Sequence, residues 1–401
     1  MLLGVSLCRA APSRALTWAE ARTAAESRAT ELQVVGRRAD VARADVRAAG
    51  MLANPTFTLT TARQSARLST GVSVPLPLFG QRGTAVRFAE AEAGVVAGEA
   101  RLTLNDLRWN ATVAWIDAWE AAERARLIAL AAAEADRLLK ITEERFQAGS
   151  APRLDVVRLT ADRARARAEA DAAVPLVAAA AGRLAVWVGA DPMAPPAVSG
   201  DPGVPADLPA LDQLVEGLGQ HPALERDRAQ QGAAGRRLEL ERRLRFPIVS
   251  AELVVNQWDS TQPGTDVIAG AAFELPVLSQ RGGAIARAEA QRGLAEATSS
   301  LDAAHLRAEL ADAFHRTRAG ASRARTIGRS ALPAMEEARA MTEESYRAGR
   351  ADLVRVLEAE RAVLDLRLAE REAIAAWSRS FADLERAVGA SLRAPGADAA
   401  R

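Results

Sequence analysis

The sequence holds very few of the side chains that build disulfides, metal sites and aromatic cores. Cys8 is its single cysteine, three residues are histidine, and aromatic residues make up 4% of the 401 residues. A single cysteine excludes a disulfide within the chain and a metal site built on several thiolates. None of His221, His305 and His315 has a second histidine or a cysteine at a ligand spacing, so we expect no metal site and expect these histidines on polar helix surfaces.

An excess of charge of one sign is also missing. The chain has 52 basic and 51 acidic residues and a formal net charge of +1. Proteins that bind a phosphate backbone normally carry a basic excess, so we expect no nucleic-acid partner. The sequence has no Gly-Lys-Ser/Thr phosphate loop, no Gly-x-Ser-x-Gly elbow and no catalytic carboxylate pair. We therefore predict a protein that is not an enzyme and needs no cofactor.

Long hydrophobic runs are absent as well. No stretch approaches 18 consecutive apolar residues, which argues against a conventional transmembrane helix. Residues 1–15 are interpreted as a residual export signal or leader, because a short apolar run from Leu2 to Leu7 precedes Cys8 without a basic region before it. Two interpretations of Cys8 remain open. It is either a lipid-attachment site, which the large Leu7 disfavours, or an ordinary thiol in a removed leader.

The residues that are abundant favour helices. Alanine carries much of the apolar 49%, and arginine carries almost all of the positive charge, because Lys140 is the only lysine. Ala, Arg, Glu and Leu are strong helix formers, and small alanine side chains let helices approach closely. The composition predicts a mainly α protein of long, closely packed helices.

The chain contains an internal repeat at an offset close to 200 residues. The matching segments are Thr142 to Gly149 with Thr342 to Gly349, Leu184 to Gly189 with Leu384 to Gly389, and Pro77 to Gly83 with Pro276 to Gly282. We divide the chain into a leader at 1–15, a first repeat at 16–189, a linker at 190–210, a second repeat at 211–389 and a tail at 390–401. Each repeat is expected to hold a helix, two strands and a long helical hairpin.

The hairpins are the largest predicted elements. Their long helices are expected at about 84–147 and about 284–347, and each would span on the order of 100 Å. Gly149 and Gly349 are expected to end these helices, because glycine adopts the left-handed C-cap conformation at little cost. Pro333 is expected to interrupt the second long helix, since it lacks an N–H group.

Four strand segments alternate between apolar and polar residues. In the first repeat Val72 and Val74 alternate with Ser73, and in the second Val255 is followed by Asn256. Four strands leave two open edges, which lipid does not tolerate, so a membrane sheet would need strands from several chains. The alternative is a pair of hairpins with one face on a soluble core.

The order and duplication of these elements resemble the TolC-like outer-membrane efflux proteins, over roughly Leu16 to Gly389. The most specific pieces are Phe146-Gln147-Ala148-Gly149 and Tyr346-Arg347-Ala348-Gly349, together with His221-Pro222-Ala223-Leu224 in place of the family's Asn-Pro-x-Leu. The resemblance implies a homotrimer with a 12-stranded barrel in the outer membrane and an α-helical tunnel in the periplasm. The Pro-Leu-Phe-Gly-Gln-Arg-Gly stretch is most similar to the heavy-metal and cation efflux branch.

The resemblance also implies where function lies. The channel would be the passive exit duct of a tripartite efflux pump, with a periplasmic adaptor and an inner-membrane transporter as partners. By residue-for-residue transfer, the gate would include Asp155, Tyr346, Arg350, Arg355 and Glu358. The adaptor would dock on the two turns, at Gly149, Ser150, Ala151, Pro152, Gly349, Arg350, Ala351 and Asp352. Two alternatives stay open: Tyr346 only packs within the hairpins, and the chain is a periplasmic adaptor or scaffold without a barrel.

Overall fold

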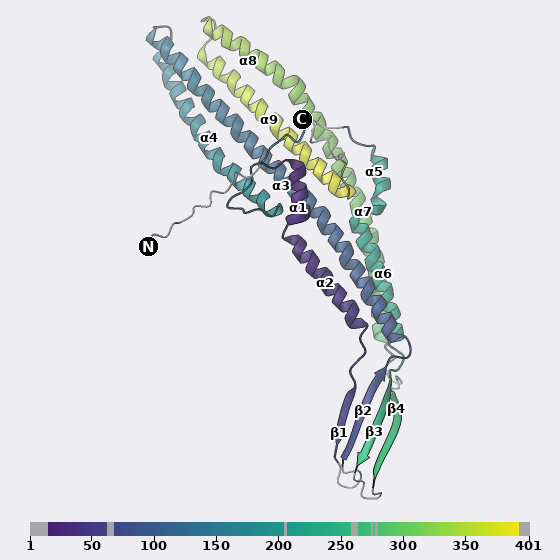
Figure 1. The fold of residues 1–401 in the computed structure, drawn as a ribbon. Coiled ribbons are helices and arrows are strands. Elements are labelled where there is room, and N and C mark those ends of the chain that lie inside the picture. Colours follow the sequence, from purple (N-terminus) through teal and green to yellow (C-terminus); the bar gives the residue numbers. More distant parts are fainter. Residues whose placement is uncertain are drawn as a thin grey trace, which may run out of the picture. The chain divides into compact units, whose positions relative to one another are not determined.

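The computed structural model describes residues 15–61, 68–203, 207–257, 264–273, 276 and 280–392 (Figure 1). The leader with Cys8 and most of the predicted tail lie outside the described residues. Each half of the chain runs through helices, a strand pair, a long helix and a return helix. In the first half these are α1 (Trp18–Arg28), α2 (Glu31–Ala49), β1 (Thr56–Thr60), β2 (Leu68–Leu76), α3 (Gln81–Gln147) and α4 (Arg153–Trp187).

The second half has the same order with more interruptions. Its elements are α5 (Leu211–Gly217), η1 (Leu218–Gln220), α6 (Pro222–Arg243), β3 (Val249–Gln257), β4 (Thr265–Phe273), α7 (Gly282–Thr326), η2 (Ile327–Ala331), α8 (Leu332–Arg347) and α9 (Leu353–Val388). The interruption expected at Pro333 is η2, a π-helical turn that immediately precedes α8. The widened turn accommodates the missing N–H group of the proline.

The chain forms two compact units. The hairpin unit comprises Met1–Gln33, Thr103–His221 and Leu306–Arg401, and the strand unit comprises Val34–Leu102 and Pro222–His305. Both repeats contribute to both units, so compactness and sequence repetition divide the chain in different ways.

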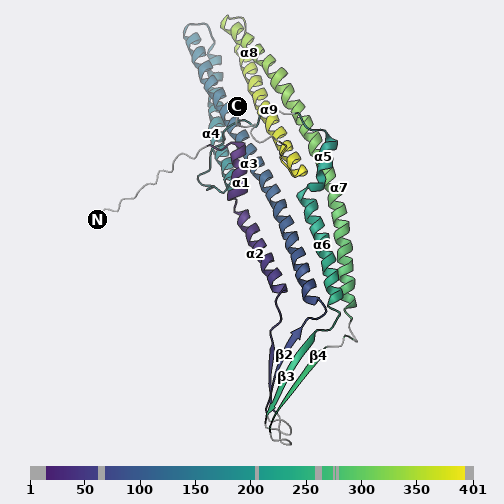
Figure 2. The ribbon, with the colours of Figure 1, turned by 45° about the vertical axis from the view of Figure 1, so that its right-hand side comes forward.

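The strand unit contains a four-stranded antiparallel sheet in the order β1-β2-β3-β4 (Figures 1 and 2). Opposed residues in neighbouring strands point to the same face, and one such row is Phe57, Val72, Leu253 and Ala269. The predicted alternation therefore produces one apolar face.

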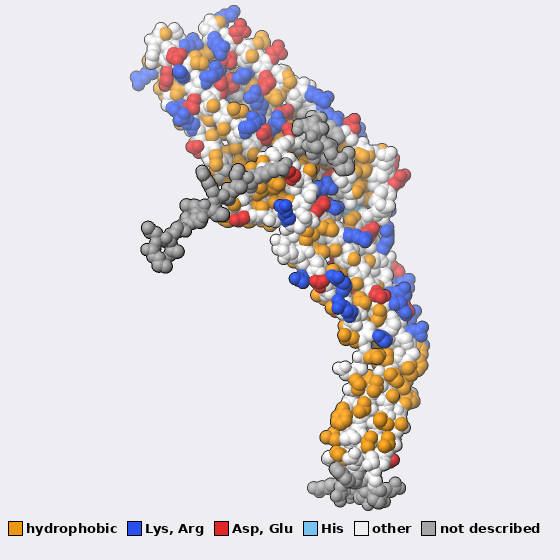
Figure 3. Space-filling model, viewed as in Figure 1, with side chains coloured by type: hydrophobic (Ala, Val, Ile, Leu, Met, Phe, Trp, Pro, Cys, Tyr) orange, Lys and Arg blue, Asp and Glu red, His pale blue; other side chains and the backbone are white. Residues whose placement is uncertain are grey.

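This apolar face of the sheet is exposed in the single chain. Phe57 is 66% exposed, Val72 40% and Leu253 48%. Hydrophobic side chains gather over the strands in Figure 3. The opposite face carries polar residues such as Ser73, whose hydroxyl lies 3.4 Å from a Glu252 carboxylate oxygen.

The junction between β2 and α3 shows why α3 begins at Gln81, three residues earlier than expected. The Gln81 side chain is buried and donates to the carbonyl oxygens of Phe246 and Pro247, at 3.3 Å each. Its own Oε1 accepts from the Phe79 backbone N–H at 3.0 Å. Within the Pro-Leu-Phe-Gly-Gln-Arg-Gly stretch, Gln81 thus fastens the start of the long helix to the chain that leaves α6.

The core of the hairpin unit is built on tryptophans. Trp18 and Trp115 have ring centroids 5.9 Å apart, and Trp377 stacks on Phe381 at 5.5 Å. Leu184 of α4 is fully buried in the same cluster. By length and composition α4 passes the test for a membrane span, with a mean hydropathy of 1.3 in its best window. In its alanine-rich C-terminal half, Ala180 and Leu184 pack into this core, and 28% of that window is buried.

Candidate functional site

The two hairpin turns have the same backbone geometry. Gly149 and Gly349 adopt left-handed φ angles of 73° and 72°. In the first turn the Ser150 N–H donates to the Arg145 carbonyl at 2.8 Å, and in the second the Arg350 N–H donates to the Ser345 carbonyl at 2.8 Å. The Gly149 N–H also donates to the Phe146 carbonyl and the Gly349 N–H to the Tyr346 carbonyl, at 3.0 Å each, which completes two Schellman motifs. The prediction that these glycines end the long helices is confirmed, because α3 ends at Gln147 and α8 at Arg347.

The return helices begin differently after these turns. Asp352 caps α9, because its side chain accepts from the Arg355 backbone N–H at 3.1 Å. Pro152 occupies the corresponding position before α4 and supplies no side-chain cap. Asp155 lies in the first turn of α4, where a carboxylate interacts favourably with the helix dipole. The helix that follows the second turn therefore has a side-chain N-cap, which the helix after the first turn lacks.

Below the turns, Tyr346 of α8 fills a socket between the two hairpins. Its ring is 4% exposed and belongs to a cluster with Leu138, Leu139, Leu159, Leu353 and Val356. Its hydroxyl lies 3.3 Å from the hydroxyl of Thr142, which is fully buried on α3. We call this cluster, with Thr142, the Tyr346 socket. It joins residues from all four hairpin helices α3, α4, α8 and α9.

The Arg145 side chain lies over the ring of Tyr346. Its guanidinium carbon lies 4.4 Å from the centroid of the Tyr346 ring, a cation–π distance. The same side chain donates to the Tyr346 carbonyl at 3.2 Å. Arg145 thus links α3 to the last turn of α8, where cations are favoured by the helix dipole.

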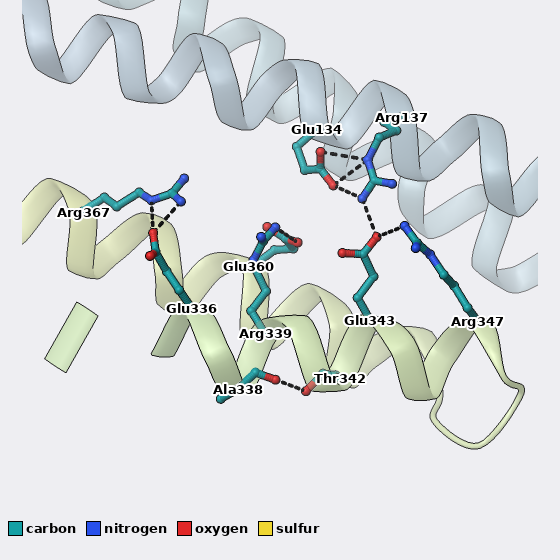
Figure 4. Close-up of polar contacts among 10 residues, drawn as sticks. All are labelled: Glu134, Arg137, Glu336, Ala338, Arg339, Thr342, Glu343, Arg347, Glu360 and Arg367. Atoms are coloured by element: carbon teal, nitrogen blue, oxygen red, sulfur yellow. Dashed lines mark hydrogen bonds and ion pairs between the residues drawn. The ribbon is translucent and has the colours of Figure 1, made fainter. Parts of the chain in front are cut away.

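An ion-pair network crosses the hairpins further from the turns (Figure 4). Arg137 of α3 lies 2.8 Å from Glu343 of α8 and also binds Glu134 on its own helix. Glu343 in turn accepts from Arg347 at 2.6 Å. The hydrogen bond from Arg137 lowers the pKa of Glu343 below its ordinary value, so this carboxylate stays charged in mild acid.

A second pair of contacts in Figure 4 holds α8 to α9. Arg339 lies 3.1 Å from Glu360, and Arg367 lies 2.6 Å from Glu336. Burial raises the pKa of Glu360, and the neighbouring Glu134 and Glu343 carboxylates add to that rise while Arg339 opposes it. The network therefore contains one carboxylate with a lowered pKa, Glu343, and one with a raised pKa, Glu360.

Comparisons with known proteins agree with this geometry. No protein-family model matches the chain. The cobalt-zinc-cadmium resistance protein CzcC of Cupriavidus metallidurans is 24% identical over 308 residues, which cover 76% of this chain and 73% of CzcC. The outer membrane protein VceC of Vibrio cholerae has a TM-score of 0.75 at 18% identity, over 94% of this chain and 97% of VceC. CusC, whose structures were solved in a study of its folding and transmembrane channel formation, has a TM-score of 0.78 at 16% identity. The match covers 96% of this chain and 96% of CusC. The chain has the fold of the TolC-like outer-membrane channels.

In this TolC-like fold the predicted gate residues differ in how far they are exposed. Tyr346 is buried in its socket, whereas Arg350, Arg355 and Glu358 are exposed. Within one chain the Tyr346 hydroxyl is hydrogen-bonded to the Thr142 hydroxyl, and the ring packs between the two hairpins. Both contacts agree with the alternative in which Tyr346 only packs within the hairpins. The predicted link from Tyr346 to Asp155, which is partly buried, stays a prediction.

The predicted docking residues surround the two turns of the TolC-like hairpins. Gly149, Ser150 and Pro152 are exposed at the first turn, and Gly349 and Asp352 at the second. The side positions Ala151 and Ala351 are partly buried, and Ala351 packs against the Tyr346 socket. Docking at this surface stays a prediction.

Sequence reasoning missed the arginines that tie this TolC-like chain together and misplaced one histidine. Arg137 and Arg145 were not singled out, because nothing local distinguishes them from the other arginines. His221, expected on a polar helix surface, is 4% exposed, and its Nε2 lies 3.0 Å from the Arg386 carbonyl oxygen. The described residues contain no group of three or more His, Cys, Asp or Glu side chains that could hold a metal ion.

Proposed function

We propose that the chain is the outer-membrane channel of a tripartite efflux pump. It would be a passive exit duct for substrates that an inner-membrane transporter delivers through a periplasmic adaptor. The TolC-like fold supports this function. The observation that carries it furthest is the sheet, whose apolar face is exposed and whose outer strands β1 and β4 each pair on one side within the described chain.

Such a sheet is suited to lipid only as part of a closed barrel, because unpaired backbone groups are costly in a bilayer. Three copies of the four-stranded sheet would supply 12 strands, within the range of known membrane barrels. The apolar row with Phe57, Val72 and Leu253 would face lipid, and Ser73 and Glu252 would face the lumen. The hairpin helices of the three copies would line a tunnel in the periplasm.

The proposed adaptor contact lies on the two hairpin turns. Both turns present the same Schellman geometry, so one adaptor element could engage each of them in the same way. The proposed gate lies just below, where Tyr346, Arg145 and the pair of Arg137 with Glu343 hold the hairpins together. Closing contacts at this level would set the width of the entrance.

The substrate class is proposed from one relative. CzcC carries cobalt, zinc and cadmium resistance in its name. Divalent metal ions are therefore the first cargo to test. Selection among them would belong to the inner-membrane transporter, because the described residues hold no metal-binding cluster.

The proposal is tested by membrane fractionation and conductance. The exported full chain should be recovered from the outer-membrane fraction as an oligomer that resists mild detergent and dissociates on heating. The purified oligomer should produce channels in planar bilayers. Recovery as a soluble periplasmic monomer would instead support the adaptor or scaffold alternative.

The docking site has its own test. The Gly349→Val variant forces a β-branched residue into a left-handed conformation, which costs about 1–2 kcal/mol and redirects the turn. It should insert as an oligomer and no longer support export. Gly389→Val is the control, since Gly389 has a φ of 77° at the far end of α9. If Gly349→Val exports normally, the adaptor docks elsewhere.

A further inference from the structure

The two halves of the chain place equivalent residues in very different surroundings. At the offset of 200, Phe146 of α3 is equivalent to Tyr346 of α8. Phe146 is 43% exposed, whereas Tyr346 is 4% exposed. The aromatic side chain at this repeated position is therefore buried in the second half and exposed to solvent in the first.

The socket itself is also duplicated. Tyr346 rests against Leu138, Thr142 and Leu159, which are all buried. The equivalent positions in the second half are Ala338, Thr342 and Ala359, and these are exposed or half-buried. We call these three residues the open seat. It lies on α8 and α9, and one chain leaves it without the aromatic side chain that its counterpart holds.

We propose that Phe146 of a second copy of this chain occupies the open seat. In one chain, the first hairpin supplies Leu138, Thr142 and Leu159, and the second hairpin supplies the aromatic residue. Repeating that arrangement places a further first hairpin against the second one, and only another copy can provide it. The contact is head-to-tail, and such contacts close into a ring when the rotation permits. This inference rests on the proposed function, which requires several copies around one tunnel.

The proposed seam between copies is weaker than the seam within a chain. Alanine replaces leucine at two of the three seat positions, so less apolar area is buried. Arg145, which covers the filled socket, is equivalent to Ser345. An arginine link at this level is therefore made only within each chain.

The charges differ in the same direction. Within the chain Arg137 pairs with Glu343 at 2.8 Å. Their equivalents are Glu337 and Glu143, both exposed in the single chain. Two carboxylates would thus face each other across the seam between copies, where like charges repel.

Paired cysteines test the seat. The Phe146→Cys/Thr342→Cys variant probes the proposed contact, and Tyr346→Cys/Thr142→Cys probes its equivalent within the chain. Both are made in the membrane-inserted oligomer and treated with a short bismaleimide, and the parent chain reports any reaction of Cys8. The first pair should give dimers and trimers on denaturing gels. The second should give only cross-linked monomer.

The outcomes separate the two proposals. A first pair that cross-links only within monomers, or not at all, in an intact oligomer overturns the open seat and leaves the channel function standing. A chain that forms no oligomer overturns both. As a second measurement, Glu337→Arg should slow dissociation of the oligomer by roughly 1.5-fold to fivefold, the effect of one exposed ion pair. An unchanged rate would remove Glu337 from the seam.

Discussion

Arg137 on α3 and Glu343 on α8 are separated by 206 residues in sequence and joined by a 2.8 Å ion pair between the two hairpins. Arg137 is held in place by Glu134 on the same helix, and Glu343 by Arg347. Each partner of the pair is therefore oriented by a second ion pair, Arg137 by Glu134 and Glu343 by Arg347. Side-chain exposures of 39% and 16% place it at the edge of the packed seam, where solvent weakens it only in part.

Removal of this pair should favour the open entrance. A partly exposed ion pair contributes up to about 1 kcal/mol, which is roughly a fivefold change in a two-state equilibrium. Arg137→Gln should therefore raise single-channel conductance or open probability in planar bilayers. Arg126→Gln is the matched control, because Arg126 lies on the same helix and its hydrogen bonds go to Glu123 one turn away. Equal effects of the two changes would show a general loss of helix stability instead.

The Tyr346 hydroxyl provides a separate prediction. Tyr346→Phe keeps the ring in its socket and removes a hydrogen bond of about 0.5–1.5 kcal/mol, a roughly twofold to tenfold shift towards the open state. Thr142→Val removes the partner hydroxyl observed in the structure and should raise conductance to a similar degree. Asp155→Asn should have little effect. If Asp155→Asn matches Tyr346→Phe and Thr142→Val does not, the link to Asp155 is the functional one.

The two faces of β3 should tolerate charge differently. Val255 lies on the apolar face, opposite Val267, and Asn256 lies on the other face, opposite Asp266. An arginine on a lipid-facing position near the bilayer centre costs about 2–4 kcal/mol. Val255→Arg should therefore reduce the yield of heat-modifiable oligomer in the outer membrane, whereas Asn256→Arg should not. Comparable yields would mean that the barrel has a different orientation.

Local signals in the sequence were sufficient for the repeat, most of the strand alternation and the C-terminal ends of the two long helices. Gly149 and Gly349 end their helices because only local backbone geometry is required there. The alternation fails at Val254 and Ile268, which face each other on the mostly polar side of the sheet. Two apolar side chains on neighbouring strands can pack against each other, and the sequence of one strand alone does not reveal this pairing.

Contacts between distant segments could not be predicted. With 52 basic and 51 acidic residues, nothing in the sequence selects Glu343 as the partner of Arg137. The break between α1 and α2 has no proline or glycine to announce it. It coincides with a close approach of Gly189, where a Cβ atom would lie 2.4 Å from the Arg28 carbonyl oxygen. Tertiary packing, rather than local propensity, decides such positions.

The buried His221 leads to a prediction on pH. Burial lowers the pKa of this imidazole below its ordinary value of 6.5, and the neutral ring donates from Nε2 to the Arg386 carbonyl oxygen at 3.0 Å. Because the unfolded chain then binds the proton more readily than the folded chain, the free energy of unfolding falls as the pH drops below about 6.5. Above that pH the contribution of His221 is fully present.

His221→Asn should remove this pH dependence while keeping a donor for the carbonyl. We expect the apparent melting temperature of the purified oligomer to fall between pH 7.5 and pH 5 in the parent, and to fall less in the variant. His305→Asn is the control, since His305 is exposed on α7. Glu343 should not contribute in this range, because the pKa of its carboxyl is lowered and the pair with Arg137 is lost only in stronger acid. A variant that keeps the full slope of the parent would assign the acid sensitivity to a carboxylate and leave His221 as a packing residue.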